Sequence, residues 1–110
     1  MEHPVTEEIT GVDLVELQIK YALNLDYTKV LQNNISKKGN SLECRLYAED
    51  PKKNFLPSPG KISKLRLPEV TKDIRIDIGV GEGDEISFYY DPMIAKIIAK
   101  GENRYETIKK

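Results

Sequence analysis

Apolar and polar positions follow two periods along the chain, helical near the N-terminus and twofold further on. Residues 13–23 carry apolar side chains at helical spacing, and Asp13 and Glu16 have the spacing of a capping box. The apolar positions form two stripes, one of Val12, Val15, Ile19 and Ala22 and one of Leu14, Leu17 and Tyr21. A helix that is apolar on two sides leaves little surface for water. We therefore expect this helix to end at a left-handed Asn24 and to pack inside a larger protein.

An irregular polar segment at residues 26–38 follows the helix, and we place a domain boundary there. After Gly39, apolar residues alternate with polar ones up to Ala48, a pattern that predicts a strand with one buried face. That face would include Cys44, which is therefore predicted to be an inert, buried thiol. The strand is expected to end before Pro51, because proline has no N–H for a sheet ladder.

Short strands are predicted next at residues 62–67, 74–80 and 85–90. Three glycines and an aspartate within residues 79–84 are typical of a turn. We therefore predict that the last two of these strands form a hairpin across that turn.

The apolar run at residues 93–100 suits a helix and a strand equally well by period. Its length between Pro92 and Gly101 is that of a strand, so we predict a strand. Asn103 and Glu106 then have capping-box spacing and predict the start of a short helix near the end of the chain.

Charge and ligand supply exclude several classes of protein. Lys and Arg total 17 and Asp and Glu total 18, which gives a formal net charge of -1 over 110 residues. Interspersed charge of this kind lacks the basic footprint of a nucleic-acid binder, and no apolar run approaches the roughly 18 residues that span a bilayer. One Cys and one His supply neither an internal disulfide nor a zinc site. We therefore predict no nucleic-acid partner, no membrane span and no metal site in the chain.

Three features suggest chemistry from the residues alone, and each has a plainer structural explanation. The glycines within residues 79–83 could approach a phosphate, yet neither Lys-Ser/Thr nor a helix start follows them, which favours a turn. Glu2 beside His3 could be a general base with a neighbour, or two solvated side chains. Arg45 lies on the polar face of its strand, where an exposed guanidinium in a weak ion pair is ordinary. The residues alone predict an α+β chain without a complete active site.

Four ordered blocks of sequence nevertheless resemble one family, the biotin carboxylases. They lie at residues 2–16 (EHPVTEEITGVDLVE), 43–51 (ECRLYAEDP), 54–62 (NFLPSPGKI) and 89–96 (YYDPMIAK). The resemblance implies an ATP-grasp enzyme that carboxylates the biotin of a carrier protein, with ATP, Mg²⁺ or Mn²⁺ and bicarbonate. It therefore implies a ligase, whose biotin-linked reaction is the first half-reaction of an acyl-CoA carboxylase.

The same resemblance assigns roles to three residues. Glu2 matches the glutamate of the E-H-P-V-T-E motif, the general base that lets bicarbonate attack the γ-phosphate and form carboxyphosphate. Arg45 matches the arginine of the E-C-R motif, which holds bicarbonate or the ureido oxygen of biotin as that oxygen becomes enolate-like. Met1 stands where the family has a valine whose backbone contacts bicarbonate, so that contact is expected to be lost or altered.

The resemblance also implies that the chain is a fragment. Residues 1–38 would be the C-terminal end of the ATP-grasp domain with its last helix, and residues 39–110 an incomplete, mostly antiparallel C-terminal domain. The ATP and metal ligands would lie upstream, so the chain alone is expected to be inactive. The parent would be similar to propionyl- or methylcrotonoyl-CoA carboxylases, a homodimer that works with a biotin carboxyl carrier domain and a carboxyltransferase subunit. It would lie in the cytoplasm, or in the mitochondrial matrix of a eukaryote. The alternative is a non-catalytic assembly or dimerisation module from a truncated gene.

Overall fold

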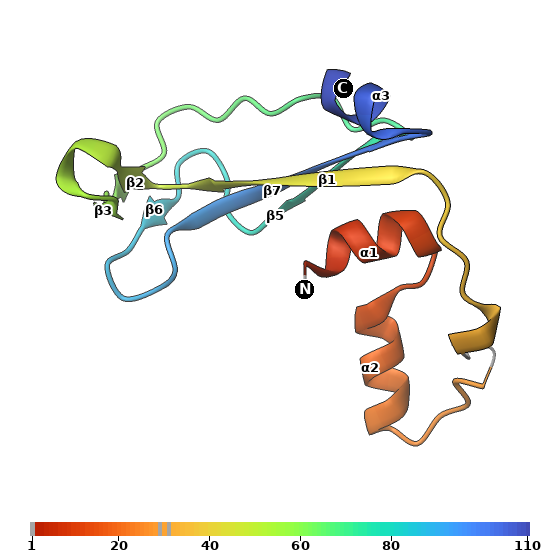
Figure 1. Ribbon diagram of the computed structural model, residues 1–110. Helices are drawn as coiled ribbons and strands as arrows, with labels where there is room; N and C mark the ends of the chain where they lie inside the picture. The colour runs from red at the N-terminus through yellow and green to blue at the C-terminus, as the bar shows by residue number, and fades with distance from the viewer. Residues whose placement is uncertain (1, 29, 31) are drawn as a thin grey trace. The chain divides into compact units, whose positions relative to one another are not determined.

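The fold is α+β, as predicted, with short α-helices and mainly antiparallel strands. The computed structural model describes residues 2–28, 30 and 32–110 (Figure 1). The α-helices are α1 (His3–Thr10), α2 (Leu14–Ala22) and α3 (Arg104–Lys109), and the 3₁₀ turns are η1 (Gln32–Asn34) and η2 (Pro51–Lys53). The strands are β1 (Asn40–Tyr47), β2 (Glu49–Asp50), β3 (Leu56–Pro57), β4 (Gly60–Lys61), β5 (Ile74–Ile78), β6 (Glu85–Ile86) and β7 (Met93–Gly101).

The chain divides into two compact units. Unit 1 comprises Met1–Glu43 and Ile98–Lys110, and unit 2 comprises Cys44–Ile97. Strands β1 and β7 each run from one unit into the other, whereas the three α-helices belong to unit 1. The domain boundary predicted between residues 38 and 39 stays a prediction.

Helix α1 was not predicted from the pattern, although both of its ends carry local signals. Pro4 lies in its first turn, where the fixed φ of proline suits a helix and the missing N–H costs nothing. Gly11 ends the helix in the left-handed region, at φ 71°, and its N–H donates to the carbonyl oxygen of Glu7 at 2.8 Å.

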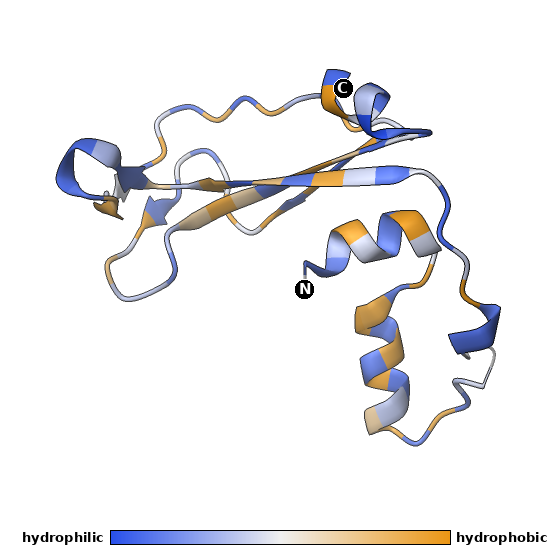
Figure 2. Ribbon diagram, in the orientation of Figure 1, coloured by the Kyte–Doolittle hydropathy of each residue, from blue (hydrophilic) through white to orange (hydrophobic). Residues whose placement is uncertain are grey.

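Helix α2 confirms the predicted helix and its capping residue. The Asp13 carboxylate accepts a hydrogen bond from the backbone N–H of Glu16 at 2.8 Å, and Asn24 after the helix has the expected left-handed φ of 54°. No residue of α2 is buried, although several of its residues are hydrophobic (Figure 2). Val15 and Ile19 are 47% and 55% exposed. Both stripes are therefore partly uncovered within the described chain, because Val12, Leu14 and Leu17 are only half-buried.

Strands β1, β7 and β5 form a three-stranded sheet in that order. The N–H of Ala48 donates to the Pro92 oxygen at 2.9 Å, and the Ser41 hydroxyl donates to the Ala99 oxygen at 2.9 Å. Contacts that descend on one strand as they ascend on the other indicate an antiparallel pair. The predicted strand at 93–100 is confirmed.

The burial of β7 explains why its period was ambiguous. Ala95 is 2% exposed and Ile98 is 1% exposed, and residues three apart in a strand point to opposite faces. Both faces of the strand are therefore covered, so its apolar residues show no clean alternation.

Two predictions about the middle of the chain are wrong. Residues 62–67 form no strand, and β6 pairs antiparallel with β4 rather than with β5. Ile62 explains this choice, because its N–H donates to the Asp84 oxygen and its own oxygen accepts from Gly83 N–H, both at 2.8 Å. The glycine-rich turn is thus hydrogen-bonded to the segment after β4.

The prediction of a buried thiol at Cys44 is also wrong, because Cys44 is exposed. Leu46 lies two residues further along β1 and is 40% exposed. Side chains at this spacing share one face of a strand, so that face of β1 is open at both positions.

Helix α3 is fixed against the sheet at a close approach of backbone. The Asn103 carboxamide accepts from Glu106 N–H at 3.0 Å, which confirms the predicted cap. Thr107 is 3% exposed, and its hydroxyl lies 3.2 Å from the Asn40 oxygen of β1. A Cβ added at Gly101 would lie 2.8 Å from the Thr107 backbone nitrogen, so this contact requires glycine.

Few apolar side chains of the described residues are buried, Pro4 and Ile98 in unit 1 and Ile86 and Ala95 in unit 2. No helix in the described part of the chain is long and apolar enough to cross a membrane.

Candidate functional site

Glu2 occupies the N-cap of α1, with extended backbone at φ -93° and ψ 107°. Its carbonyl oxygen accepts from the N–H of Thr6 at 3.5 Å, and the residue is partly buried. Glu2 therefore lies beside the unpaired N–H groups at the start of the helix, and its side chain makes no capping hydrogen bond to them.

Helix α1 is held in unit 1 by contacts along its second half. Glu7, 9% exposed, accepts a hydrogen bond from Leu14 N–H at 2.9 Å and so fixes the α1–α2 corner. The Ile9 oxygen accepts from the N–H of Lys38 at 2.7 Å. Lys100 of β7 pairs with Glu8 at 3.7 Å. These contacts set the direction of α1 and therefore the place of the residue at its start.

Arg45 lies on β1 in unit 2 and is exposed, as predicted. Its Nη1 donates to the phenolic oxygen of Tyr47 at 3.2 Å. The guanidinium carbon lies 5.8 Å from the centre of the Tyr47 ring, within the range of a cation–π contact. The sequence reasoning did not single out Tyr47, although the two-residue spacing on a strand was a signal for the contact.

The structure places Glu2 in unit 1 and Arg45 in unit 2, and each is described within its own unit. Met1 lies outside the described residues. The roles that the resemblance gives these three residues stay predictions.

The glycine-rich turn at residues 79–84 uses one of its backbone N–H groups to bind its own aspartate. Gly81 N–H donates to the Asp84 carboxylate at 2.6 Å, so a side chain of the turn already takes that donor. Gly83, at φ 97°, supplies the left-handed conformation that the turn requires. The prediction of a turn at these residues is confirmed. The predicted hairpin between β5 and β6 does not form, because β6 pairs with β4.

Unit 2 also contains an open hollow that the sequence reasoning missed. Its volume is about 520 Å³, and it is lined by Pro59, Gly60 and residues 85–89. Three consecutive aromatic residues beside it are strongly exposed, Phe88 at 74%, Tyr89 at 92% and Tyr90 at 81%. Alternation had predicted a strand as far as residue 90, whereas β6 ends at Ile86.

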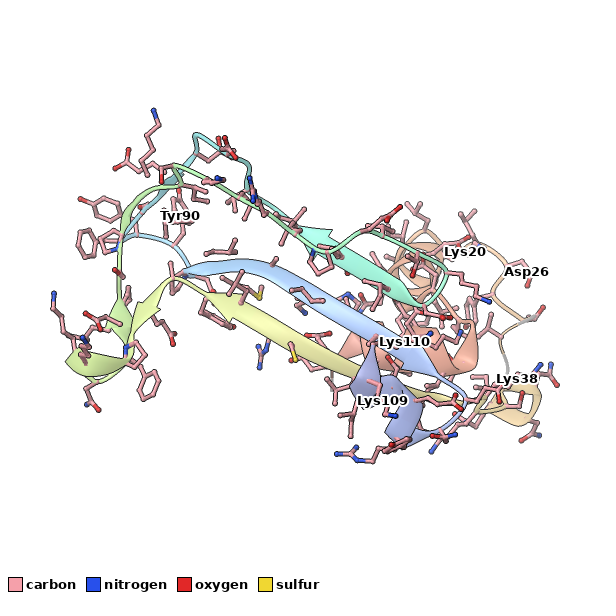
Figure 3. The ribbon with its side chains drawn as sticks, turned by 90° about the horizontal axis from the view of Figure 1, so that it is seen from above. Lys20, Asp26, Lys38, Tyr90, Lys109 and Lys110 are labelled. Atoms are coloured by element: carbon pink, nitrogen blue, oxygen red, sulfur yellow. The ribbon has the colours of Figure 1, made fainter. Side chains whose placement is uncertain are left out.

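The described surface holds a carboxyl group with a lowered pKa and no cluster of metal ligands. Hydrogen bonds from the Thr28 side chain and then from its N–H, with a smaller contribution from the charge of Lys20, lower the pKa of the exposed Asp26 carboxyl (Figure 3). Among residues 2–28, 30 and 32–110, no three His, Cys, Asp or Glu side chains gather as metal ligands would.

The described structure is thus an α+β chain with a carboxylate at the start of a helix and an exposed arginine on a strand. Residues 43–110 match the sequence profile of the biotin carboxylase C-terminal domain, and the chain belongs to this family. This confirms the resemblance seen in the four sequence blocks.

Relatives match the whole chain. It is 48% identical over 110 residues to biotin carboxylase 2 of Bacillus subtilis, covering 100% of this chain and 24% of that protein. It is 47% identical to the propionyl-CoA carboxylase alpha chain of the pig Sus scrofa, covering 15% of that protein. The chain thus spans about a quarter of the first relative and less of the second.

Solved structures agree with the fold. The biotin carboxylase domain of a thermophilic 2-oxoglutarate carboxylase bound to bicarbonate has a TM-score of 0.90 and is 42% identical, and the match covers 99% of this chain and 24% of that one. The biotin carboxylase subunit of a pyruvate carboxylase also has a TM-score of 0.90, at 40% identity and the same coverage.

Proposed function

We propose that this chain forms the C-terminal part of an ATP-dependent biotin carboxylase, which joins bicarbonate to carrier-bound biotin through carboxyphosphate. The observation that carries the proposal is the exposed Arg45 guanidinium, placed on β1 inside a domain of the biotin carboxylase family. The solved neighbour bound to bicarbonate supports an anionic substrate of this kind.

In the proposed reaction Glu2 accepts the proton of bicarbonate. The freed oxygen then bonds to the γ-phosphorus of ATP as the bond to the bridging oxygen breaks, and ADP leaves with the electron pair. Arg45 acts where negative charge is held or develops, first on bicarbonate and then on the ureido oxygen of biotin. A guanidinium is permanently charged and presents a fork of donors, which suits an oxyanion.

Metal ions do not fit the described part of the chain, because it offers no cluster of three ligands. We therefore assign no step of the reaction to a metal held by these residues. ATP contacts are assigned to the parts of a biotin carboxylase that this chain does not span.

The choice of acyl substrate is not expected to be set by this segment. Relatives named for propionyl-CoA and methylcrotonoyl-CoA are 47% and 44% identical to it, and neighbours named for 2-oxoglutarate and pyruvate are 42% and 40% identical. We propose an acyl-CoA carboxylase with a carrier domain, a carboxyltransferase and a dimeric carboxylase domain as the setting.

The test replaces the matched segment of Bacillus subtilis biotin carboxylase 2 with this chain and measures bicarbonate-dependent ATP cleavage. We expect the chimera to be active. Arg45→Ala should lower kcat by roughly 100- to 1000-fold, as the loss of an oxyanion donor does. Glu2→Gln should lower it by roughly 100-fold or more. Arg66→Ala, at an exposed arginine outside any described element, is the matched control and should leave the rate unchanged.

An inactive chimera beside an active parent enzyme would overturn the proposal, and full activity of Arg45→Ala would remove the site assignment. The second candidate, an assembly module, is favoured by the exposed aromatic residues 88–90, since contiguous exposed apolar surface marks contact sites. It predicts that the chain alone associates with a biotin carboxylase during size-exclusion chromatography while adding no activity.

A further inference from the structure

We propose that Tyr47 is a positioning residue that fixes the guanidinium of Arg45. The inference rests on the proposed function, because it concerns the arginine to which that proposal assigns the oxyanion. It names a residue that neither the sequence blocks nor the comparisons single out. Arg45 and Tyr47 both lie in unit 2, so their geometry is contained within one unit.

Strand geometry brings the two side chains together. Residues two apart on β1 project from the same face, so Arg45 and Tyr47 are neighbours whatever covers the strand. Tyr47 meets the guanidinium in two ways. Its phenolic oxygen lies 3.2 Å from Nη1, and its ring centre lies 5.8 Å from the guanidinium carbon.

An arginine on an open strand needs such a neighbour if it is to act on a transition state. Its free side chain carries about 2 kcal/mol of rotamer entropy, which must be lost when it binds an oxyanion. Tyrosine has only two side-chain torsions, so a contact to it confines the arginine at low entropic cost. The tyrosine therefore prepares the guanidinium before the substrate arrives.

The direction of the hydrogen bond adds a second consequence. Arginine has no acceptor, so the phenolic oxygen of Tyr47 must accept and its own proton is directed elsewhere. That proton is a further donor close to the guanidinium. Both effects favour an anion at Arg45, and neither involves ATP.

Two variants in the active chimera separate the hydroxyl from the ring. Tyr47→Phe keeps the ring and loses the hydroxyl, and it should lower kcat/KM for bicarbonate about fivefold, the size expected for one exposed charged hydrogen bond. Tyr47→Leu loses both contacts and should lower it about tenfold to thirtyfold. KM for ATP should change less than twofold in both variants, a selectivity that general loss of structure would not produce.

The Arg45→Ala variant completes a double-mutant cycle with Tyr47→Phe. In that background Tyr47→Phe should change the residual rate less than twofold, because a residue that acts through Arg45 has nothing left to position. Tyr105→Phe, at an exposed tyrosine of α3, is the matched control and should match the unchanged chimera. Melting temperatures of all variants identify any loss of folding.

The outcomes distinguish this inference from the proposed function. If Arg45→Ala lowers the rate and Tyr47→Phe does not, positioning by Tyr47 is overturned and the proposed function stands. Equal effects of Tyr47→Phe with and without Arg45 would also overturn it, because the tyrosine would then act independently. If Arg45→Ala is fully active, the site assignment fails, and with it any role for Tyr47 through that arginine.

Discussion

Replacing Gly39 with alanine should destabilise the chain far more than the same change at Gly11, although both glycines have a φ of 71°. A left-handed conformation costs an L-residue roughly 1–2 kcal/mol, and the loss of unfolded-state freedom returns about 0.4–1 kcal/mol. This conformational cost is common to both sites, so their difference isolates the space around the added Cβ.

The surroundings of the two sites differ sharply. A Cβ at Gly39 would lie 2.5 Å from the Gly101 carbonyl oxygen, whereas a Cβ at Gly11 meets nothing within 4 Å. The obstructing atom is backbone and must move with β7, at a cost typical of overpacking, roughly 1–3 kcal/mol. We therefore expect Gly11→Ala to cost about 1 kcal/mol and Gly39→Ala about 2–4 kcal/mol.

Urea unfolding of the 110-residue chain, followed by circular dichroism, measures both values. The slope of unfolding free energy against urea should be the same in both variants, so that the midpoints report stability alone. Equal losses at the two glycines would refute the close approach of residue 39 to the end of β7.

Three smaller predictions use the same chain. Lys100→Met should cost at most about 1 kcal/mol, because its ion pair with Glu8 spans 3.7 Å between side chains that are 40% and 22% exposed; a loss that did not shrink in 1 M salt would argue against an ionic origin. Thr107→Val should cost about 1–2 kcal/mol in urea unfolding, since it removes a hydroxyl at a residue only 3% exposed, which lies 2.8 Å from the Asn103 oxygen and 3.2 Å from the Asn40 oxygen and shares its single proton between them; an unchanged midpoint would contradict that hydrogen bonding. Thr28→Val should raise the pKa of Asp26 part of the way towards its ordinary value, measured by NMR titration, because the 2.6 Å hydroxyl bond is lost while the 2.9 Å bond from the N–H remains. The lowered pKa means that the stabilisation by Asp26 is complete above the ordinary pKa and lost as the pH falls through the lowered one; an unchanged pKa in the variant would exclude the hydroxyl as its cause.

Local signals predicted what local interactions determine. The cap at Asp13, the left-handed Asn24 and the cap at Asn103 each involve atoms no more than a few residues apart. The signals for α1 were equally local, Pro4 and Gly11, yet the polar residues between them masked the helix. Its apolar side is narrow, so the pattern alone gave no helical stripe.

The alternation of apolar and polar residues did not predict which strands pair with each other. The choice of β4 rather than β5 as the partner of β6 depends on hydrogen bonds between Ile62 and the turn at residues 83–84. Nothing in the alternation of the two segments encodes that choice, because a strand of only two residues carries no period. The exposure of Cys44 failed for a related reason, since alternation predicts which residues share a face but not whether another element covers it.

The candidate site shows the same division between local and distant information. The residues alone indicated a solvated Glu2 and an exposed Arg45, and only the resemblance gave them chemistry. The structure adds what an exposed arginine lacks by itself, a neighbour that restricts it. Because strand spacing puts Tyr47 on the same face, this contact to Arg45 is encoded within three residues of β1. Glu2 is different, since its place depends on the contacts that hold α1. Loss of one of these contacts should therefore disturb the proposed base.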